Sequence, residues 1–290
     1  MQVTSLEIDC RNRKPVKIVF CGDDHLGADN CCKKTQARVI NHIAKNDCFW
    51  MHTGDGIEAI SKSDLRCDVR GIDKEIVHDF EDLDRMLQLQ IKAFVDAYKP
   101  IKDKLIAAVD GNHVDKLRRM YGIDPYYEMM LGLRPQKTKY KRLYGSHSLG
   151  YDGFVVLILR LTKSQLHRVV IYIHHGYTAS RTRGAMVNSL NNMFNSMVAD
   201  VIVVGHAHNL ADVRMQRIEV TQGYEIKHHH KLGISVPSLL KTYSDGEYES
   251  YAGRRGYPPA YIGAVELAID PDVFYLPSRA DESPYQYRVI

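Results

Sequence analysis

Short apolar runs recur along this chain, and each of them ends in a polar turn. Five runs are rich in residues that favour β-structure and predict buried strands, over residues 17–20, 49–51, 105–109, 169–173 and 201–204. Elsewhere, apolar residues recur at spacings of three and four, the helical period, and predict helices over residues 34–45, 73–98 and 185–198. Strands that alternate with helices are typical of an α/β fold.

Weaker patterns complete the expected architecture. Residues 143–149 and 154–161 predict an antiparallel pair of strands around a glycine-containing turn, and residues 210–220 and 261–269 predict two more strands. Strand–helix units occur in both halves of the chain, so we expect two packed sheets with helices outside. We expect one domain over residues 1–277 and a C-terminal tail over residues 278–290.

The polar turns carry the candidate chemistry. A turn that follows a strand places its side chains at the carboxyl edge of a sheet, where open α/β folds build their sites. The five turns offer oxygen and imidazole ligands without any thiolate, and that set suits two divalent cations. They are Asp23-Asp24-His25, Gly54-Asp55, Gly111-Asn112-His113, His174-His175-Gly176 and Gly205-His206-Ala207-His208. Each turn alone is weak evidence, because Asp, Asn and Gly are common at strand ends.

All five motifs in this order resemble the calcineurin-like metallophosphoesterase superfamily, and the resemblance covers roughly residues 15–270. It implies a four-layer αββα sandwich of two mixed β-sheets flanked by helices. It also implies that Asp55 bridges two metal ions. Further ligands would be Asp23, His25 and His208 at the first ion, and Asn112, His175 and His206 at the second.

The resemblance also assigns a reaction. It implies phosphoester hydrolysis through a metal-bound hydroxide, with His113 as a catalytic residue that is not a ligand. One position departs from the family pattern, because Val114 stands where an acidic residue usually follows the Asn-His pair, and Asp115 is one residue later. Asp24, Asp110 and Asp212 are candidates to support the ligand histidines. Manganese is the expected metal, with iron or zinc as alternatives.

Two clusters of neighbouring histidines raise the question of which members could bind metal. His174 and His175 are adjacent and point to opposite faces of a strand, so only one can face the metals. The family places the ligand directly before glycine, which selects His175 and leaves His174 as a packed or hydrogen-bonded residue. His228-His229-His230 lies in a predicted strand, and we do not expect it to bind metal.

Composition narrows the class of protein. The chain is 44% hydrophobic and 26% charged with a net charge of +4, which is ordinary for a globular protein. No run reaches the roughly 20 apolar residues of a membrane span, and we expect no signal peptide. The cysteines form no Cys-x-x-Cys pair, so we expect a reduced, cytoplasmic protein without a zinc site built from cysteines; they are Cys10, Cys21, Cys31, Cys32, Cys48 and Cys67.

Several basic and aromatic segments bear on the substrate. Lys137–Arg142 is basic, Arg181 and Arg183 are candidates to bind phosphate, and tyrosines surround Arg254 and Arg255. With the resemblance, which in layout is closest to the DNA repair exonuclease branch, these favour a nuclease or other phosphodiesterase. That branch also implies an ATPase partner, and a homodimer is a further possibility.

The alternative is a hydrolase for a small nucleotide or other phosphoester. In that case the tyrosine-rich segment around Arg254 and Arg255 would only cover the active-site cleft. A non-catalytic scaffold is disfavoured, because every ligand position is filled.

Overall fold

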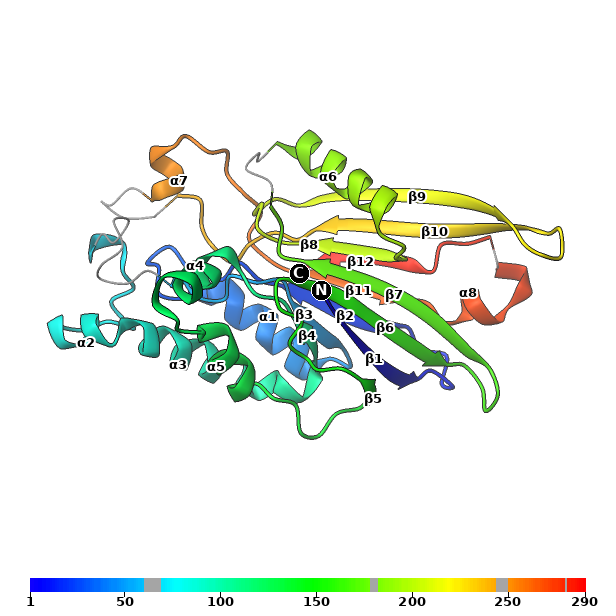
Figure 1. Ribbon diagram of the computed structural model, residues 1–290, viewed down its shortest axis with the longest axis horizontal. Helices are drawn as coiled ribbons and strands as arrows, with labels where there is room; N and C mark the ends of the chain where they lie inside the picture. Colours follow the sequence, from blue (N-terminus) through cyan, green and yellow to red (C-terminus); the bar gives the residue numbers. More distant parts are fainter. Residues whose placement is uncertain (60–68, 178–181, 244–249, 280) are drawn as a thin grey trace.

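Two β-sheets pack face to face, and helices cover both outer faces (Figure 1). The computed structural model describes residues 1–59, 69–177, 182–243, 250–279 and 281–290. The larger sheet contains, in spatial order, β5 (Lys141–Tyr144), β1 (Gln2–Asp9), β6 (Asp152–Arg160), β7 (Leu166–His174), β8 (Val201–Val204), β10 (Ile226–Ser235) and β9 (Ala211–Val220). The smaller sheet contains β12 (Tyr285–Val289), β11 (Val265–Ile269), β2 (Val16–Cys21), β3 (Phe49–His52) and β4 (Leu105–Ala108).

Helices form the two outer layers. The outer face of the smaller sheet is covered by α1 (Lys33–Lys45), α3 (Met86–Tyr98), α4 (Asn112–Tyr121) and α5 (Pro125–Gly132), and that of the larger sheet by α6 (Arg183–Ser196). The remaining helices and 3-10 turns are short: η1 (Val69–Gly71), α2 (Phe80–Asp84), η2 (Lys99–Lys104), α7 (Tyr251–Arg254), α8 (Asp272–Tyr275) and η3 (Pro277–Arg279). The predicted four-layer αββα sandwich of two mixed sheets is confirmed.

The central strands β2, β4 and β8 are apolar on both faces because both faces are buried. In β2, Ile18 and Phe20 point into the core between the sheets, whereas Val19 and Cys21 point toward the helices. Successive side chains of a strand alternate in direction, so a strand between two packed layers needs an unbroken apolar run. This explains why the apolar runs identify the central strands. Within the described residues, no helix combines the length and the apolar character needed to cross a membrane.

β1 was not predicted, and it changes the pairing of its neighbours. β1 lies between β5 and β6, antiparallel to β5 and parallel to β6. The expected antiparallel pairing of residues 143–149 with residues 154–161 is therefore wrong, and β6 pairs antiparallel with β7 instead. Leu6 and Ile8 of β1 are buried, Val3 is exposed, and the other residues of the strand are polar, which is why its pattern is weak.

Two other expectations are corrected. The helix predicted over residues 73–98 is two helices, α2 and α3. The first of them, α2, begins only at Phe80, because the Asp79 side chain caps it by accepting a hydrogen bond from the backbone N–H of Asp82. The segment from residue 278 onward, expected to be a tail, ends in β12, which pairs antiparallel with β11. Tyr285 of β12 is buried in the core between the sheets, so this segment completes the smaller sheet.

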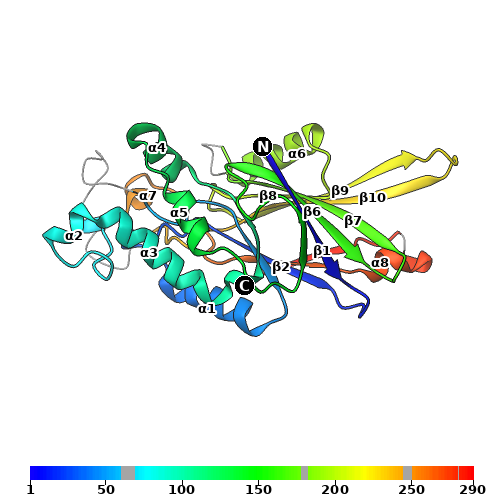
Figure 2. The same cartoon turned by 60° about the horizontal axis from the view of Figure 1, so that its bottom comes forward.

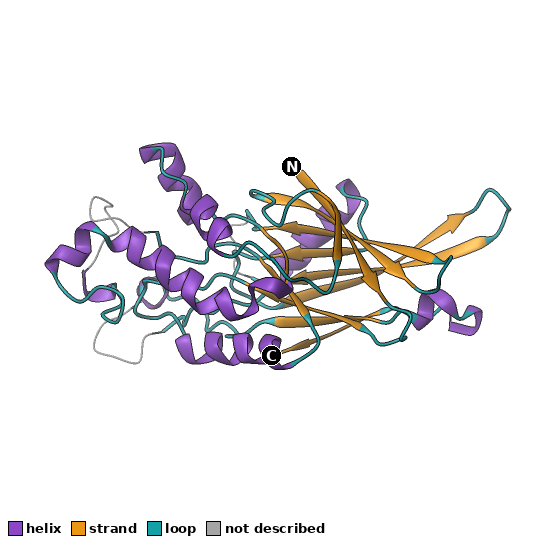
Figure 3. Ribbon diagram, turned by 90° about the horizontal axis from the view of Figure 1, so that it is seen from below, coloured by secondary structure: helices purple, strands orange, loops and turns teal. Residues whose placement is uncertain are grey.

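Parallel strands bring the polar turns together. β2, β3 and β4 are parallel neighbours in the smaller sheet, and β7 and β8 are parallel neighbours in the larger one. Their carboxyl ends carry the five turns. Figure 3 shows loops gathered at the ends of the strands beside the helices, and Figure 2 shows the β9–β10 ribbon extending away from that end.

Candidate metal centre

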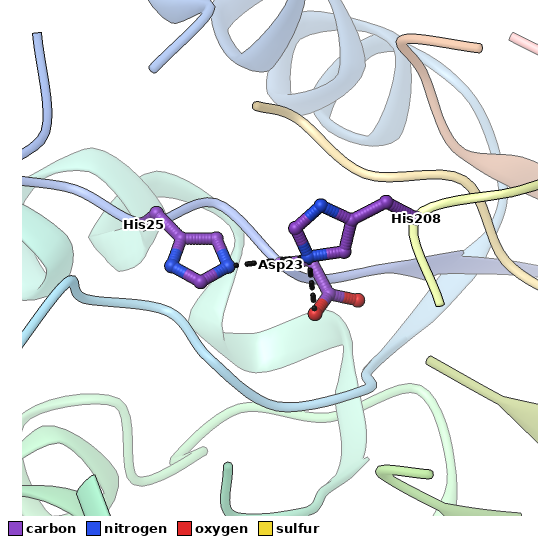
Figure 4. A group of neighbouring side chains, drawn as sticks. All are labelled: Asp23, His25 and His208. Carbon is purple, nitrogen blue, oxygen red and sulfur yellow. Dashed lines mark hydrogen bonds and ion pairs between the residues drawn. The ribbon is translucent and has the colours of Figure 1, made fainter. Parts of the chain in front are cut away.

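Three ligand side chains from two sheets meet beyond β2 and β8 (Figure 4). The ligand atoms of Asp23, His25 and His208 all lie within 4.8 Å of one another. The Nε2 atoms of His25 and His208 are 3.3 Å apart, and Nε2 of His208 is 3.4 Å from Oδ1 of Asp23. Asp23 and His25 are buried, and His208 is 9% exposed. This group matches the residues expected at the first ion.

A second group lies next to the first. The ligand atoms of Asp55, His175 and His206 also lie within 4.8 Å of one another. Nε2 of His175 is 3.2 Å from Oδ2 of Asp55 and 3.0 Å from Oδ1 of Asn112. The backbone N–H of His206 donates to Oδ2 of Asp23 over 2.9 Å, which joins the two groups. All seven expected ligands are thus brought into one site.

The backbone at this site is strained. Asp23, His25, Asp55, His206 and His208 have φ values of 50°, 50°, 48°, 66° and 56°. L-residues rarely adopt this left-handed region, although Asp and His do so more readily than most, and such residues cluster at functional sites. Glycine accompanies them: a Cβ on Gly111 would come within 1.9 Å of Oδ1 of Asp55. The motif glycine therefore leaves room for the carboxylate.

Hydrogen bonds orient two of the ligand rings. Nδ1 of His25 is 2.7 Å from Oε2 of Glu58, and Nδ1 of His175 is 2.8 Å from the backbone oxygen of Thr53. Both partners are acceptors, so each Nδ1 carries the proton, and the Nε2 lone pair of the neutral ring is directed into the site. Metal-ligating histidines usually have such partners.

One buried oxygen indicates what the site would hold. Oδ1 of Asp23 has no hydrogen-bond partner among the described residues, although Asp23 is fully buried. A buried carboxylate oxygen without a donor is costly, and a divalent cation would satisfy it. Carboxylate, amide and imidazole ligands without a thiolate suit manganese, iron or zinc. The residues at this site therefore fit the metal ions that the motifs imply.

The electrostatics agree with a cation site. Burial opposes the charged form of His25, but Glu58, Asp55 and Asp23 outweigh it and raise its pKa to about 9. Burial likewise opposes charge on His175, yet Asp55 and Asp23 raise its pKa to about 9. A cluster of carboxylates that attracts protons so strongly also attracts a divalent cation, which would replace those protons.

His206 differs from the other rings, because burial and the neighbouring His175 lower its pKa to about 4. A neutral imidazole is the form that binds a metal ion. Asp55 is ionised: burial opposes its charge, but His175, His113 and His25 hold its pKa well below the usual value.

His113 lies beside the two groups and is supported by Glu58. Its backbone N–H donates to Oδ1 of Asp55 over 3.1 Å, and its Nδ1 is 2.8 Å from the backbone oxygen of Glu58. The ring stacks edge-on against His25 with 4.7 Å between centroids. Val114 points into the core, and Asp115 pairs with Arg118 and Arg119. Asp115 therefore does not take the place of the missing acid, and Glu58 is the carboxylate near His113.

The three aspartates expected to support ligand histidines make other contacts. Asp24 binds His52, Tyr98 and Gln36; Asp110 binds Arg118; and Asp212 lies 3.9 Å from Arg214. The acid that does support a ligand is Glu58, which sequence reasoning missed. The sequence feature that could have identified Glu58 is its position three residues after Asp55, on the same turn.

His174 is packed and hydrogen-bonded, as expected. Nδ1 of His174 accepts a hydrogen bond from the backbone N–H of Gly176 over 2.7 Å, and its ring contacts Tyr151 and Tyr177. His229 pairs with Glu219 on the β9–β10 ribbon, and His230 binds the backbone oxygen of Asp281. The described part of the chain contains no metal-ligand group that includes residues 228–230.

The basic segments separate in space. Lys139 pairs with Asp47, and Arg142 donates to the backbone oxygen of Ile106 over 2.8 Å. Residues 137–142 therefore lie near the amino ends of β3 and β4, away from the polar turns. Arg183 begins α6 and is exposed, whereas Arg181 lies outside the described residues. Five cysteines are free thiols in the described ranges, and Cys67 falls outside them.

Comparisons with known proteins add little to this geometry. No family model and no curated protein matches the chain. A similar solved structure is that of a metallophosphoesterase from Sphaerobacter thermophilus, 10% identical, covering 95% of this chain and 88% of that one with a TM-score of 0.40. Another is a conserved uncharacterized protein, a predicted phosphoesterase, from Streptococcus pneumoniae TIGR4, 11% identical, covering 88% and 84% with a TM-score of 0.32. Likeness this low identifies neither a family nor a substrate, so the functional conclusion depends on the side chains at the site.

Proposed function

We propose that this protein is a dinuclear-metal-dependent phosphoesterase of the calcineurin-like superfamily, and that it hydrolyses phosphodiesters. The observation that carries the proposal is the pair of adjacent ligand groups, Asp23 with His25 and His208, and Asp55 with His175 and His206. Asn112 adds an amide oxygen 3.0 Å from Nε2 of His175. Seven side chains from five separate turns would rarely converge in this way without a ligand to hold.

The residues divide the work at the site. Asp23, His25 and His208 would hold one ion, and Asn112, His175 and His206 the other, with Asp55 between them. Two such ions, when bound, polarise a phosphate and lower the pKa of water toward neutrality. Manganese is the metal we expect, because the ligand set mixes nitrogen and oxygen.

His113 is the proposed general acid. Nδ1 of His113 contacts the backbone oxygen of Glu58, so Nδ1 carries a proton and Nε2 is the nitrogen available to the substrate. In the protonated ring, Nε2 would donate a proton to the oxygen of the leaving group. Burial opposes the charge of Glu58, but His113 and His25 keep its pKa lowered. Oε1 of Glu58 lies 3.8 Å from Nδ1 of His113.

We propose nucleic acid or a nucleotide as the substrate. Tyr177 directly follows the ligand turn His175-Gly176 and is 62% exposed. Tyr243 is 45% exposed and belongs to the segment that leaves the site after Leu239, whose N–H binds the backbone oxygen of Asp23. Exposed aromatic rings next to a phosphate site can stack on bases. Arg183, Arg254 and Arg255 are exposed cations that could contact the backbone phosphates.

A manganese-supplemented activity panel tests this function. It compares bis-p-nitrophenyl phosphate, p-nitrophenyl phosphate, linear single- and double-stranded DNA, RNA and cyclic nucleotides. Asp55→Asn serves as the blank, since a contaminating hydrolase would be unaffected by it. We expect the diester to be cleaved faster than the monoester, and a nucleic acid to be cleaved. Faster monoester cleavage without nucleic-acid cleavage would instead identify a small-molecule phosphatase, and an inactive wild type that binds no metal would exclude both.

A further inference from the structure

A fully buried carboxylate lies between two of the ligands. Asp24, which is 0% exposed, stands between Asp23 and His25 in the chain and points away from the metal centre. Its Oδ1 accepts hydrogen bonds from the Tyr98 hydroxyl at 2.6 Å and the Gln36 amide at 2.8 Å, and its Oδ2 lies 2.7 Å from Nε2 of His52. Every one of these partners comes from outside the ligand turn.

His52 connects this carboxylate to a second ligand turn. Its Nδ1 accepts a hydrogen bond from the backbone N–H of Gly54 over 3.2 Å, directly before Asp55. Because Nδ1 is an acceptor, the proton of the neutral ring is on Nε2, which donates to Asp24. The ring is 2% exposed and is held edge-on by Phe94 and Tyr98, with centroids 5.2 Å and 5.8 Å away. One imidazole thus bonds to both turns at once.

The two turns need such a connection because both are strained. Asp23, His25 and Asp55 have left-handed φ values, and Gly54 has a φ of 101°. Such a conformation is costly for residues other than glycine, and it persists only when the surrounding structure over-determines it. Backbone bonds already join the turns, from Asp23 N–H to Gly54 O and from His25 N–H to Asp55 O. His52 adds a further link between the turns through buried side chains, because it bonds both Asp24 and the backbone N–H of Gly54.

We propose that His52, acting with Asp24, is a positioning residue that holds the Asp23–His25 turn and the Asp55 turn in register for metal binding. The inference rests on the proposed function. It has a specific consequence, because His52 touches neither ion but supports ligands of both. Loss of His52 should weaken both metal sites together, whereas loss of His206 should weaken mainly one.

Three variants separate positioning from general stability. His52→Phe keeps an aromatic ring of similar size and removes both polar contacts. His52→Gln keeps one donor and one acceptor in the side chain. Ile269→Val is the control: Ile269 lies in the same sheet, is fully buried in the core between the sheets, and pairs with Val16 at the amino end of β2, so this change costs stability away from both turns.

Calorimetric titration of the EDTA-treated full chain with Mn²⁺ gives the readout, together with the Mn²⁺ electron paramagnetic resonance spectrum. Outer contacts of this kind typically change metal affinity by about 10–100-fold. We expect such a loss at both sites in His52→Phe, partial recovery in His52→Gln, and wild-type affinity in Ile269→Val despite a lower melting temperature. Circular dichroism establishes that each variant is folded.

The outcomes distinguish this inference from the proposed function. Wild-type protein that binds no pair of Mn²⁺ ions would overturn the proposed function. Wild-type protein that binds two ions, together with unchanged affinity in folded His52→Phe, would overturn the role of His52 alone. An equal loss of affinity in His52→Phe and Ile269→Val would show that His52 acts only as a core residue, and it would also overturn the inference.

Discussion

Glu58 supports His25 through a contact of 2.7 Å between its Oε2 and Nδ1 of the imidazole. The opposite ring nitrogen, Nε2, faces Nε2 of His208 in the metal centre. The backbone oxygen of the same Glu58 lies 2.8 Å from Nδ1 of His113. One residue therefore orients both a proposed metal ligand and the proposed general acid.

Glu58→Gln should weaken metal binding and turnover together. The amide keeps the shape of the side chain but removes the charge that favours a proton on Nδ1 of His25. A loss of about 10–100-fold in metal affinity or activity is typical of such a partner. Glu75→Gln is the control, because Glu75 is 80% exposed and pairs only with Lys33 in the described contacts. Equal behaviour of the two variants in Mn²⁺ titration would contradict the role of Glu58.

Asp55→Asn should lower the metal content at both positions. The amide carries no charge with which to screen two adjacent cations, and one of its terminal atoms becomes a donor. Metal analysis after reconstitution should give about two ions per chain for the wild type, the number of a dinuclear site, and clearly fewer for the variant. Asp47→Asn, a change at an exposed carboxylate near the amino end of β3, should leave the content unchanged. A wild type with one ion or none would contradict the dinuclear site.

His113→Ala should reduce turnover far more than metal content. General acid catalysis is typically worth about 10²–10⁴-fold, and His113 is not in the ligand set. The comparison is kcat on bis-p-nitrophenyl phosphate beside metal analysis of the same sample. His229→Ala, on the exposed ribbon, controls for loss of any histidine. Near-normal kcat, or loss of the metals, would show that the role is misassigned.

The metal-free protein should lose stability as the pH rises. The folded pKa of His25 and of His175 is about 9, above the roughly 6.5 of an unfolded histidine. Stability from these groups is therefore fully present below pH 6.5 and is lost as the pH rises through 9. Melting temperatures in EDTA should fall over this range, and saturating Mn²⁺ should suppress the fall because it replaces the protons. A flat profile in EDTA would contradict the raised pKa values.

Replacement of Arg254 and Arg255 by alanine should weaken nucleic-acid binding and flatten its salt dependence. Each phosphate contact adds about 0.7–0.9 to the slope of log affinity against log salt, so loss of two should lower the slope by up to twice that amount. Fluorescence anisotropy with labelled DNA over a range of salt concentrations measures it. Lys137→Ala with Lys139→Ala removes equal charge away from the metal centre and should change little. No effect of the arginine pair would disfavour this surface.

The central strands and the ligands could be predicted because one physical constraint fixes both. Strands buried on two faces must be apolar throughout, and the prediction for β8 has the same bounds as the strand itself. Polar residues directly after such a strand have no position except the sheet edge. The strand ends therefore located the candidate ligands, the family resemblance chose among them, and their roles stay proposals.

Features that depend on tertiary contacts escaped prediction. β1 has too few apolar residues to stand out, and its pairing is decided by its neighbours. The basic run 137–142 looks like a substrate surface, yet Arg142 satisfies backbone oxygens near the amino end of β4. Glu58 and His52 resemble ordinary strand-end residues in the sequence. The folded chain shows that the Glu58 carboxylate contacts His25 and that the His52 ring accepts a hydrogen bond from Gly54.

The proposed ligands are shared between two sheets, and this has a consequence for assembly. Asp23, His25, Asp55 and Asn112 follow strands of the smaller sheet, whereas His175, His206 and His208 follow strands of the larger one. Neither half of the chain could complete either ion's shell by itself. Metal binding would therefore follow the docking of the two sheets. The bound ions would then link the sheets and stabilise only the completely folded sandwich.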